Sequence, residues 1–359
     1  MNFRYFLIAL VSLILLQGGL GAMAAAATGQ ISTSGAKAST ASKAPAKSKA
    51  LKISIRKATG KKAAEKKAAK KKLRKVTLNR NAARAAARAA ADEAVVLDQL
   101  GNPMLRSSAF LVTNATTGAV ILEKKSEALL PIASITKLMT AMVVLDAGQS
   151  LSDELVVTSE DIDTIKGTGS RLALGTRLTR EEMLQLALMS SENRAASALA
   201  RHYPGGAAAF VNAMNVKARL LGMADSRFRD STGLNPDNVS SAHDLSRMVA
   251  AAATYPLIRE FSTASERHVM IRGRLHRFGN TNSLVRSPEW EIGLSKTGYI
   301  REAGRCLVMQ AWLLNQPVII VLMGSEGRYT RTADAKRVKK WLEAVGAQRV
   351  AALTEAQGS

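Results

Sequence analysis

The amino-acid composition changes abruptly near residue 92, and this change limits which part of the chain can fold. Between Thr28 and Ala91 the chain has no aromatic residue and consists mainly of Ala, Lys, Arg, Ser and Thr. Such a segment cannot bury enough apolar surface to offset the conformational entropy that folding costs. We therefore expect residues 27–91 to be a disordered basic linker. Residues 92–350 should form the folded domain, with 351–359 as a short C-terminal tail.

The net charge of +23 follows the same division. The segment from Thr28 to Ala91 holds 19 Lys and Arg and one acid, Glu65, a net of +18, whereas the part from Asp92 onward holds 31 basic and 27 acidic residues, a net of +4. The basic segment resembles arms that bind nucleic acid. Behind an export signal, however, no nucleic-acid partner is expected. An anionic polymer of the cell envelope is the expected partner, and a solvated spacer is the alternative.

The first 26 residues have the features of a secretory signal peptide. Arg4 precedes an apolar run from Tyr5 to Leu16, and Ala22-Met23-Ala24 is a small-x-small cleavage site. The alternative, a membrane anchor, is disfavoured because the run is shorter than the about 20 residues that a bilayer span needs. The single cysteine, Cys306, excludes an intrachain disulfide, and its apolar neighbours predict a buried strand.

Apolar periodicity in the remaining chain predicts one sheet covered by helices. Strands are expected at Ala109–Asn114 and Val120–Glu123, and helices dominate the middle, where Thr179 to Glu182 form a capping box. The pattern returns to strands late in the chain. They are expected at His268–Ile271, Leu294–Gly298, Cys306–Leu314 and Val318–Met323, with a last helix at Ala333–Val345. Strands at both ends predict that the first strands pair with the last ones.

Three short motifs occur in one order: S-x-x-K at Ser134–Lys137, S-x-N at Ser191–Asn193 and K-T-G at Lys296–Gly298. Each alone is weak, because short patterns of common residues recur by chance. Their contexts strengthen them. The first begins a predicted amphipathic helix, the second lies between two helices, and the third ends a predicted strand. The alternative is a helical domain in which these Ser and Lys residues occur by chance. The occurrence of three motifs in matching contexts disfavours it.

The residue types suit nucleophilic catalysis. A serine hydroxyl becomes a good nucleophile when a base takes its proton, and Lys137 lies one helical turn from Ser134 on the same face. Lys137 must be neutral to act as this base, and burial and the nearby charge of Lys296 would both lower its pKa. Ser191 is placed to relay a proton to a leaving amine. Asn193 is placed to hold a substrate amide.

The K-T-G motif suits substrate binding. Lys296 and Thr297, with Gly298, are expected at the carboxylate of a substrate. The backbone N–H groups of Ser134 and Tyr299 are expected to form an oxyanion hole. No metal ligand set and no cofactor are expected.

With these motifs the chain resembles the low-molecular-mass penicillin-binding proteins, which are serine D,D-peptidases. The similarity extends from about Ser108 to Val345 and includes 230–235 (DSTGLN) and 240–245 (SSAHDL). It implies an α/β (α+β) fold of the β-lactamase/transpeptidase type, with an antiparallel sheet, helices packed on it and a helical subdomain. It also implies acylation of Ser134 by D-Ala-D-Ala-like peptides, with peptidoglycan stem peptides and crosslinks as substrates and β-lactams as inhibitors. Together with the signal peptide, it predicts a periplasmic protein, soluble or peripherally associated.

Within the family the chain is most similar to the murein D,D-endopeptidase branch. Only 61 residues follow Gly298, whereas carboxypeptidase relatives carry a further β-rich domain and an amphipathic anchor. The residue after K-T-G is Tyr299 instead of the histidine common in carboxypeptidases. We therefore expect cleavage of D-alanyl crosslinks, with D-alanyl-D-alanine carboxypeptidase activity as the alternative.

Three other classes fit less well. A non-catalytic penicillin-binding sensor is disfavoured because Ser134, Lys137 and Ser191 are all present. A class A β-lactamase carries an acid in an E-x-x-L-N motif, and Ser231 stands at that place here. A serine–histidine–acid triad is disfavoured because none of the four histidines lies in a suitable motif.

Overall fold

The structure is a computed structural model, and it describes residues 95–357, with side chains to residue 346. The predicted signal peptide, 1–26, and linker, 27–91, lie outside the described residues. Within residues 95–357, no helix is both long and apolar enough to span a membrane.

The centre of the described part is a five-stranded antiparallel sheet in the order β2-β1-β11-β10-β9. Its strands are β1 (Ala109–Asn114), β2 (Val120–Lys124), β9 (Glu291–Ile300), β10 (Gly304–Leu313) and β11 (Gln316–Ser325). β1 pairs with β11, with Ala109 opposite Met323 and Asn114 opposite Val318. The predicted pairing of the first strands with the last ones is confirmed, and Cys306 is fully buried in β10 as expected.

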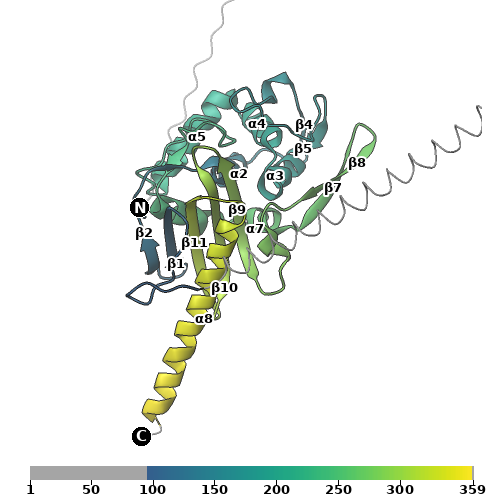
Figure 1. Cartoon of the computed structure of the whole chain (residues 1–359). Coiled ribbons are helices and arrows are strands. Elements are labelled where there is room, and N and C mark those ends of the chain that lie inside the picture. The colour runs from purple at the N-terminus through teal and green to yellow at the C-terminus, as the bar shows by residue number, and fades with distance from the viewer. Residues whose placement is uncertain (1–94, 358–359) are drawn as a thin grey trace, which may run out of the picture. The chain divides into compact units, whose positions relative to one another are not determined.

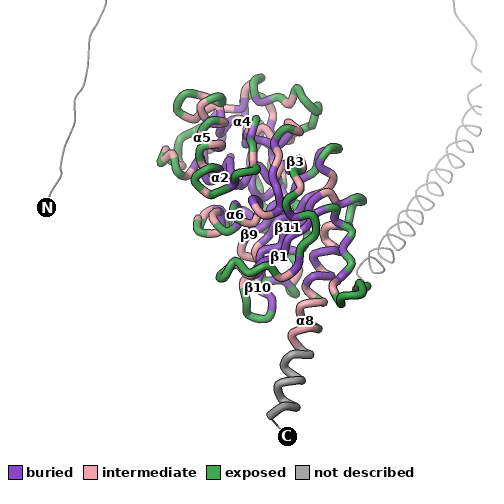
Figure 2. Tube along the Cα trace, turned by 90° about the vertical axis from the view of Figure 1, so that its left-hand side faces the viewer, coloured by how far each residue is buried: buried purple, intermediate pink, exposed green. Residues whose placement is uncertain are grey.

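Both faces of the sheet are covered, so its central strands are buried almost throughout (Figure 2). On β11, Ile320 and Leu322 pack into one core with Val338 of helix α8 (Thr330–Gln357). The alternate residues, such as Val321, face a second, larger core that includes residues of the helical subdomain. This alternation is the two-residue period of a strand with apolar layers on both sides.

Within residues 95–357, six further helices surround the second face and extend above it (Figure 1). They are α2 (Lys137–Asp146), α3 (Arg180–Met189), α4 (Asn193–Arg201), α5 (Gly206–Leu220), α6 (Ala242–Ala252) and α7 (Pro256–Thr263). The predicted capping box forms at the start of α3: Glu182 N–H donates to Thr179 Oγ1 at 3.1 Å, and Thr179 N–H donates to the Glu182 carboxylate at 3.0 Å. The predicted fold class, an antiparallel sheet with packed helices and a helical subdomain, is confirmed.

Short two-stranded sheets add to this frame. They pair β3 (Leu130–Pro131) with β6 (Val239–Ser240), β4 (Glu154–Val156) with β5 (Arg177–Thr179), and β7 (Glu266–Ile271) with β8 (Arg274–Gly279). The hairpin of β7 and β8 turns at Arg272 and Gly273, which both have positive φ, as a two-residue type I′ turn requires. Single 3₁₀ turns lie at η1 (Ala133–Thr136), η2 (Ser159–Asp161) and η3 (Ser283–Arg286).

Several local predictions were wrong. The K-T-G motif does not end a strand, because β9 continues to Ile300. Ser134 lies in the 3₁₀ turn η1, one turn before the α-helix that was expected to begin there. The sequence analysis also failed to predict α7, which has only eight residues. It missed β8 and the pair β4–β5 as well, because their segments are short or interrupted by charged residues.

Candidate active site

The structure brings the three predicted motifs together between the sheet and the helices. Ser134 comes from η1, which packs against β9. Ser191 and Asn193 come from the junction between α3 and α4, and Lys296 comes from the interior of β9. Two buried lysines connect these elements, because Lys137 and Lys296 are 0% and 1% exposed.

Lys137 is the centre of the site. Its Nζ donates to Ser134 Oγ at 2.9 Å, to Asn193 Oδ1 at 2.8 Å and to the carbonyl oxygen of Thr232 at 2.7 Å. These three acceptors come from three different elements of the chain. A lysine has three N–H donors, so each donor of Lys137 has a partner.

A loop before β6 positions the carbonyl of Thr232. The Asp230 carboxylate accepts from the Thr232 hydroxyl at 2.9 Å, from Gly233 N–H at 2.7 Å and from Asn235 N–H at 3.1 Å. The Asn238 side chain donates to the same carboxylate and to Thr136 of η1, at 2.9 and 3.0 Å. Asp230 therefore fixes the loop that supplies an acceptor to Lys137.

Lys296 forms a second lysine–serine pair. Its Nζ donates to Ser191 Oγ at 2.9 Å and to the carbonyl oxygen of Thr297 at 3.0 Å. The hydroxyl of Thr297 donates to Thr281 Oγ1 at 2.7 Å. The site thus holds two serine hydroxyls, each with a buried amine within hydrogen-bond distance.

Burial changes the acid–base properties of both lysines. Burial lowers the pKa of Lys137 from 10.5 to about 7, although the negative charges of Asp230 and Glu192 oppose the shift. The pKa of Lys296 is also well below its ordinary value, first because of burial and then because of the positive charges of Lys137 and Arg331. The sequence analysis expected burial and the charge of Lys296 to act on Lys137. In the structure the repulsion between the two lysines acts on the other partner: the positive charge of Lys137 lowers the pKa of Lys296.

The backbone at the site is unusually close-packed. A Cβ on Gly298 would lie 2.8 Å from the carbonyl oxygen of Ile132 and 3.2 Å from the nitrogen of Ser134. This contact explains the glycine of K-T-G, because β9 runs directly alongside the turn that carries Ser134. Ala133 and Ser191 have positive φ angles of 47° and 62°, a conformation that costs energy for residues with a side chain and that is common at functional sites.

Two arginines support the site that the sequence analysis did not identify. Arg171 pairs with Glu192, the middle residue of S-x-N, at 3.1 Å. Arg331, from the start of α8, donates to the carbonyl oxygens of Gly298 and Cys306 at 2.9 and 3.2 Å. Neither residue lies in a short motif, so only their contacts identify them.

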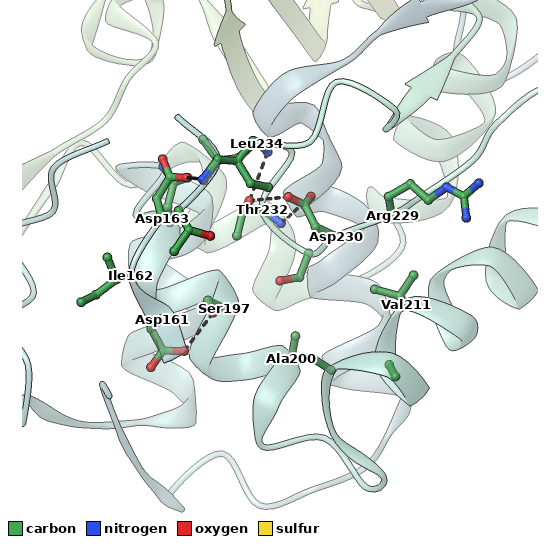
Figure 3. A pocket seen from close by; sticks show the side chains of 16 residues that line it. Asp161, Ile162, Asp163, Ser197, Ala200, Val211, Arg229, Asp230, Thr232 and Leu234 are labelled. Atoms are coloured by element: carbon green, nitrogen blue, oxygen red, sulfur yellow. Dashed lines mark hydrogen bonds between the residues drawn. The ribbon is translucent and has the colours of Figure 1, made fainter. Parts of the chain in front are cut away.

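Asn193 lines two cavities. One, of about 440 Å³, is lined by the S-x-N residues and by 169–171. The other, of about 500 Å³, lies on the side of Asp230 and Thr232, with mostly apolar walls from α4, α5 and the loop after η2 (Figure 3). Asn193 Nδ2 donates to Thr168 Oγ1 at 3.0 Å, while its Oδ1 accepts from Lys137. In the described residues, no group of three or more His, Cys, Asp and Glu side chains is arranged to hold a metal ion.

The chain matches known proteins over most of this domain. Residues 96–327 match the family model described as D-alanyl-D-alanine carboxypeptidase. A D-alanyl-D-alanine endopeptidase of Pseudomonas aeruginosa is 46% identical over 241 residues, which cover 67% of this chain and 78% of that protein. A D-alanyl-D-alanine carboxypeptidase of Bacillus subtilis is 32% identical over 227 residues, 62% of this chain and 58% of that protein. The crystal structure of a Streptomyces DD-transpeptidase superposes with a TM-score of 0.63 at 25% identity, covering 68% of this chain and 99% of that one.

The close packing at Ser134 leads to a test on two glycines. A Cβ on Gly233 (φ +80°) would stand 1.9 Å from the carbonyl oxygen of Ala133, whereas one on Gly222 (φ +70°) would meet no atom within 4 Å. Both alanine variants carry left-handed strain of about 1–2 kcal/mol. Only Gly233→Ala should displace η1, and it should slow labelling by a fluorescent penicillin by about 100-fold, since displacement of about 1 Å has that effect.

Labelling kinetics and thermal unfolding of both variants check this expectation. Gly222→Ala should label at the rate of the unchanged protein. Equal rates for the two variants would show that η1 tolerates the added methyl group.

Proposed function

The chain belongs to the D-alanyl-D-alanine carboxypeptidase family and is a serine D,D-peptidase, and from this we propose that it hydrolyses D-alanyl crosslinks of peptidoglycan through an acyl-enzyme on Ser134. One observation supports this most directly. A lysine with a pKa of about 7 lies 2.9 Å from the hydroxyl of Ser134. At neutral pH a large share of this amine is uncharged and is able to accept the serine proton.

Acylation then proceeds as follows. Lys137 takes the proton of Ser134, and the serine oxygen attacks the carbonyl carbon of the D-alanyl residue. Negative charge develops on the carbonyl oxygen, and the backbone N–H groups of Ser134 and Tyr299 are the proposed donors to it. The close approach of β9 to the Ser134 backbone, seen at Gly298, supports this pairing of donors.

The leaving group requires a proton and a binding site. We assign the proton relay to Ser191, whose hydroxyl lies 2.9 Å from Lys296 Nζ, and amide binding to Asn193. Lys296, Thr297 and Gly298 are the proposed site for the carboxylate beside the scissile bond. A carboxylate there would favour the charged form of Lys296 and offset the burial that lowers its pKa.

Water completes the cycle by hydrolysing the acyl-enzyme. Ser231, at the place of the acid in class A β-lactamases, is buried, and its hydroxyl donates to the carbonyl oxygen of Ala196 at 3.0 Å. This hydroxyl supplies no carboxylate to activate a water molecule. Slow release of a bound β-lactam is therefore expected, which makes β-lactams inhibitors of this enzyme.

The roles of Ser134 and Lys137 are tested by covalent labelling. Ser134→Ala should abolish labelling by a fluorescent penicillin, and Lys137→Ala should slow it by about 100-fold or more. In the unchanged protein the labelling rate should rise as the pH increases through about 7, because Lys137 loses its proton there and becomes a base. Ser246→Ala changes a half-buried serine of α6 that lies outside the site, and this variant should label normally. Full labelling of Ser134→Ala would refute the assignment.

Endopeptidase activity is the more specific part of the proposal. It is supported by the endopeptidase relative at 46% identity, compared with 32% for the carboxypeptidase relative. Purified enzyme should convert crosslinked muropeptide dimers to monomers faster than it releases D-alanine from pentapeptide monomers, as measured by mass spectrometry of the products. Lys296→Ala should weaken the cleavage of dimers, and amidating the carboxylate beside the scissile bond should do the same.

The opposite substrate preference would support the alternative, D-alanyl-D-alanine carboxypeptidase activity. If the enzyme releases D-alanine readily and leaves dimers intact, it is a carboxypeptidase.

Export to the periplasm and a role of the basic segment in the envelope complete the proposal. The basic segment, with a net charge of +18 between Thr28 and Ala91, should bind anionic envelope polymers. Deleting 28–91 should leave the cleavage of small muropeptides unchanged and weaken binding to isolated sacculi. The difference should shrink at high salt, because salt screens exposed charges. Sedimentation with sacculi measures this, and equal binding at low salt would leave the segment as a spacer.

A further inference from the structure

The hairpin of β7 and β8 is a concentrated positive surface outside the catalytic motifs. Its residues, 266–279, include four arginines and one glutamate, a net charge of +3 without the two histidines. Figure 1 shows this hairpin extending away from the central sheet. Its tip contacts the helical subdomain, where Arg272 donates to the carbonyl oxygen of Leu174 at 2.6 Å.

A cavity of about 410 Å³ lies at this hairpin. Its lining residues are Arg171, Ala173, Ile271, Arg272, Arg274 and His276. None of these six is acidic, and three are arginines. A hollow with such walls attracts anions and holds them with directed N–H donors.

Not every arginine of the hairpin is available to a ligand. Arg277 pairs with Glu266, and Arg267 pairs with Glu182 at 3.0 Å. Of the arginines that line the cavity, Arg171 pairs with Glu192 at 3.1 Å and keeps only part of its donors for a ligand. In contrast, the exposed side chain of Arg274 makes no hydrogen bond or ion pair within the described residues. All N–H donors of the Arg274 guanidinium are therefore available to an anion in this cavity.

The cavity is next to the catalytic cleft. Arg171 lines both this cavity and the cavity formed by Ser191 and Asn193. Strand β8 ends at Gly279, and Thr281 follows it and accepts the hydrogen bond of Thr297 in K-T-G. Because K-T-G is the proposed site for the carboxylate beside the scissile bond, the hairpin lies on the side where the leaving group departs.

We propose that the cavity of Arg171, Arg272 and Arg274 binds carboxylates of the stem peptide that leaves when a crosslink is cut. This inference rests on the proposed endopeptidase function and names its specificity site. A crosslinked dimer carries a second peptide with carboxylates beyond the scissile bond, whereas a pentapeptide monomer releases only D-alanine. The cavity therefore recognises the dimer and contributes nothing to the monomer.

Direct binding tests the site independently of catalysis. The inactive Ser134→Ala protein is titrated calorimetrically with a crosslinked muropeptide dimer. The same titration is repeated with the double variant that carries both Ser134→Ala and Arg274→Gln. Loss of one charge-assisted contact should weaken binding about tenfold. Arg259→Gln removes the same charge from an exposed helix position and should change nothing. A dimer whose second-stem carboxylates are amidated should bind equally with and without Arg274→Gln.

Kinetics of the active enzyme provide the second readout. Arg274→Gln should raise KM for dimers about tenfold with kcat unchanged, and Arg274→Lys should restore part of the loss. Labelling by penicillin and D-alanine release from pentapeptides should stay as they were. Equal dimer binding by Arg274→Gln and Arg259→Gln would overturn the proposal.

Phosphate groups of lipids are another source of anions in an envelope. Binding of the unchanged protein and of Arg274→Gln to phosphatidylglycerol vesicles is therefore measured in a separate experiment. If Arg274→Gln abolishes vesicle binding and leaves dimer binding unchanged, the cavity serves a lipid surface and the proposal is wrong. A protein that binds dimers through Arg274 but fails to cut them would refute the endopeptidase function and leave the carboxylate site standing.

Discussion

The burial of the Lys137 amine determines how the rest of the site is built. An amine removed from water needs oxygen acceptors for its donors, or its burial costs several kcal/mol. Its three acceptors belong to η1, to α4 and to the loop fixed by Asp230, so these elements must meet at one point. The same burial lowers the pKa of Lys137 to about 7. A single constraint thus organises the helical subdomain around the site and prepares the amine to act as a base.

The backbone of the site is held in conformations that isolated residues avoid. Ala133 and Ser191 have positive φ, and the turn of Ala133 is enclosed by Gly233 on one side and Gly298 on the other. Strain of this kind persists only where surrounding packing determines the conformation. Here the packing comes from a strand that is buried on both faces and from a loop fixed by the hydrogen bonds of the Asp230 carboxylate. The rigidity of the sheet and of the Asp230 loop is therefore what holds Ser134 in place.

Local patterns predicted those parts of the fold whose cause is local. The capping box of α3 depends on residues three positions apart, and it forms as expected between Thr179 and Glu182. The buried strand around Cys306 and the pairing of β1 with β11 follow from apolar runs at the two ends of the chain. The prediction failed for β8, which has only two large apolar residues, Leu275 and Phe278, because its strand geometry comes from a two-residue turn and its partner β7. It also failed at the end of β9, because pairing with β10 extends that strand beyond K-T-G.

By itself the sequence determined the change of composition and charge near residue 92, the three motifs and their order, and the fold class, since these depend on composition and spacing. Only the tertiary structure decided which groups face each other. The pairing of Lys296 with Ser191, the acceptor that Thr232 supplies to Lys137, and the proximity of the arginine-lined cavity to the cleft all join residues far apart in the chain. Such contacts depend on how helices and strands pack, and no short pattern encodes that packing. The low pKa of Lys137 belongs to the same class, because burial is a property of the folded chain.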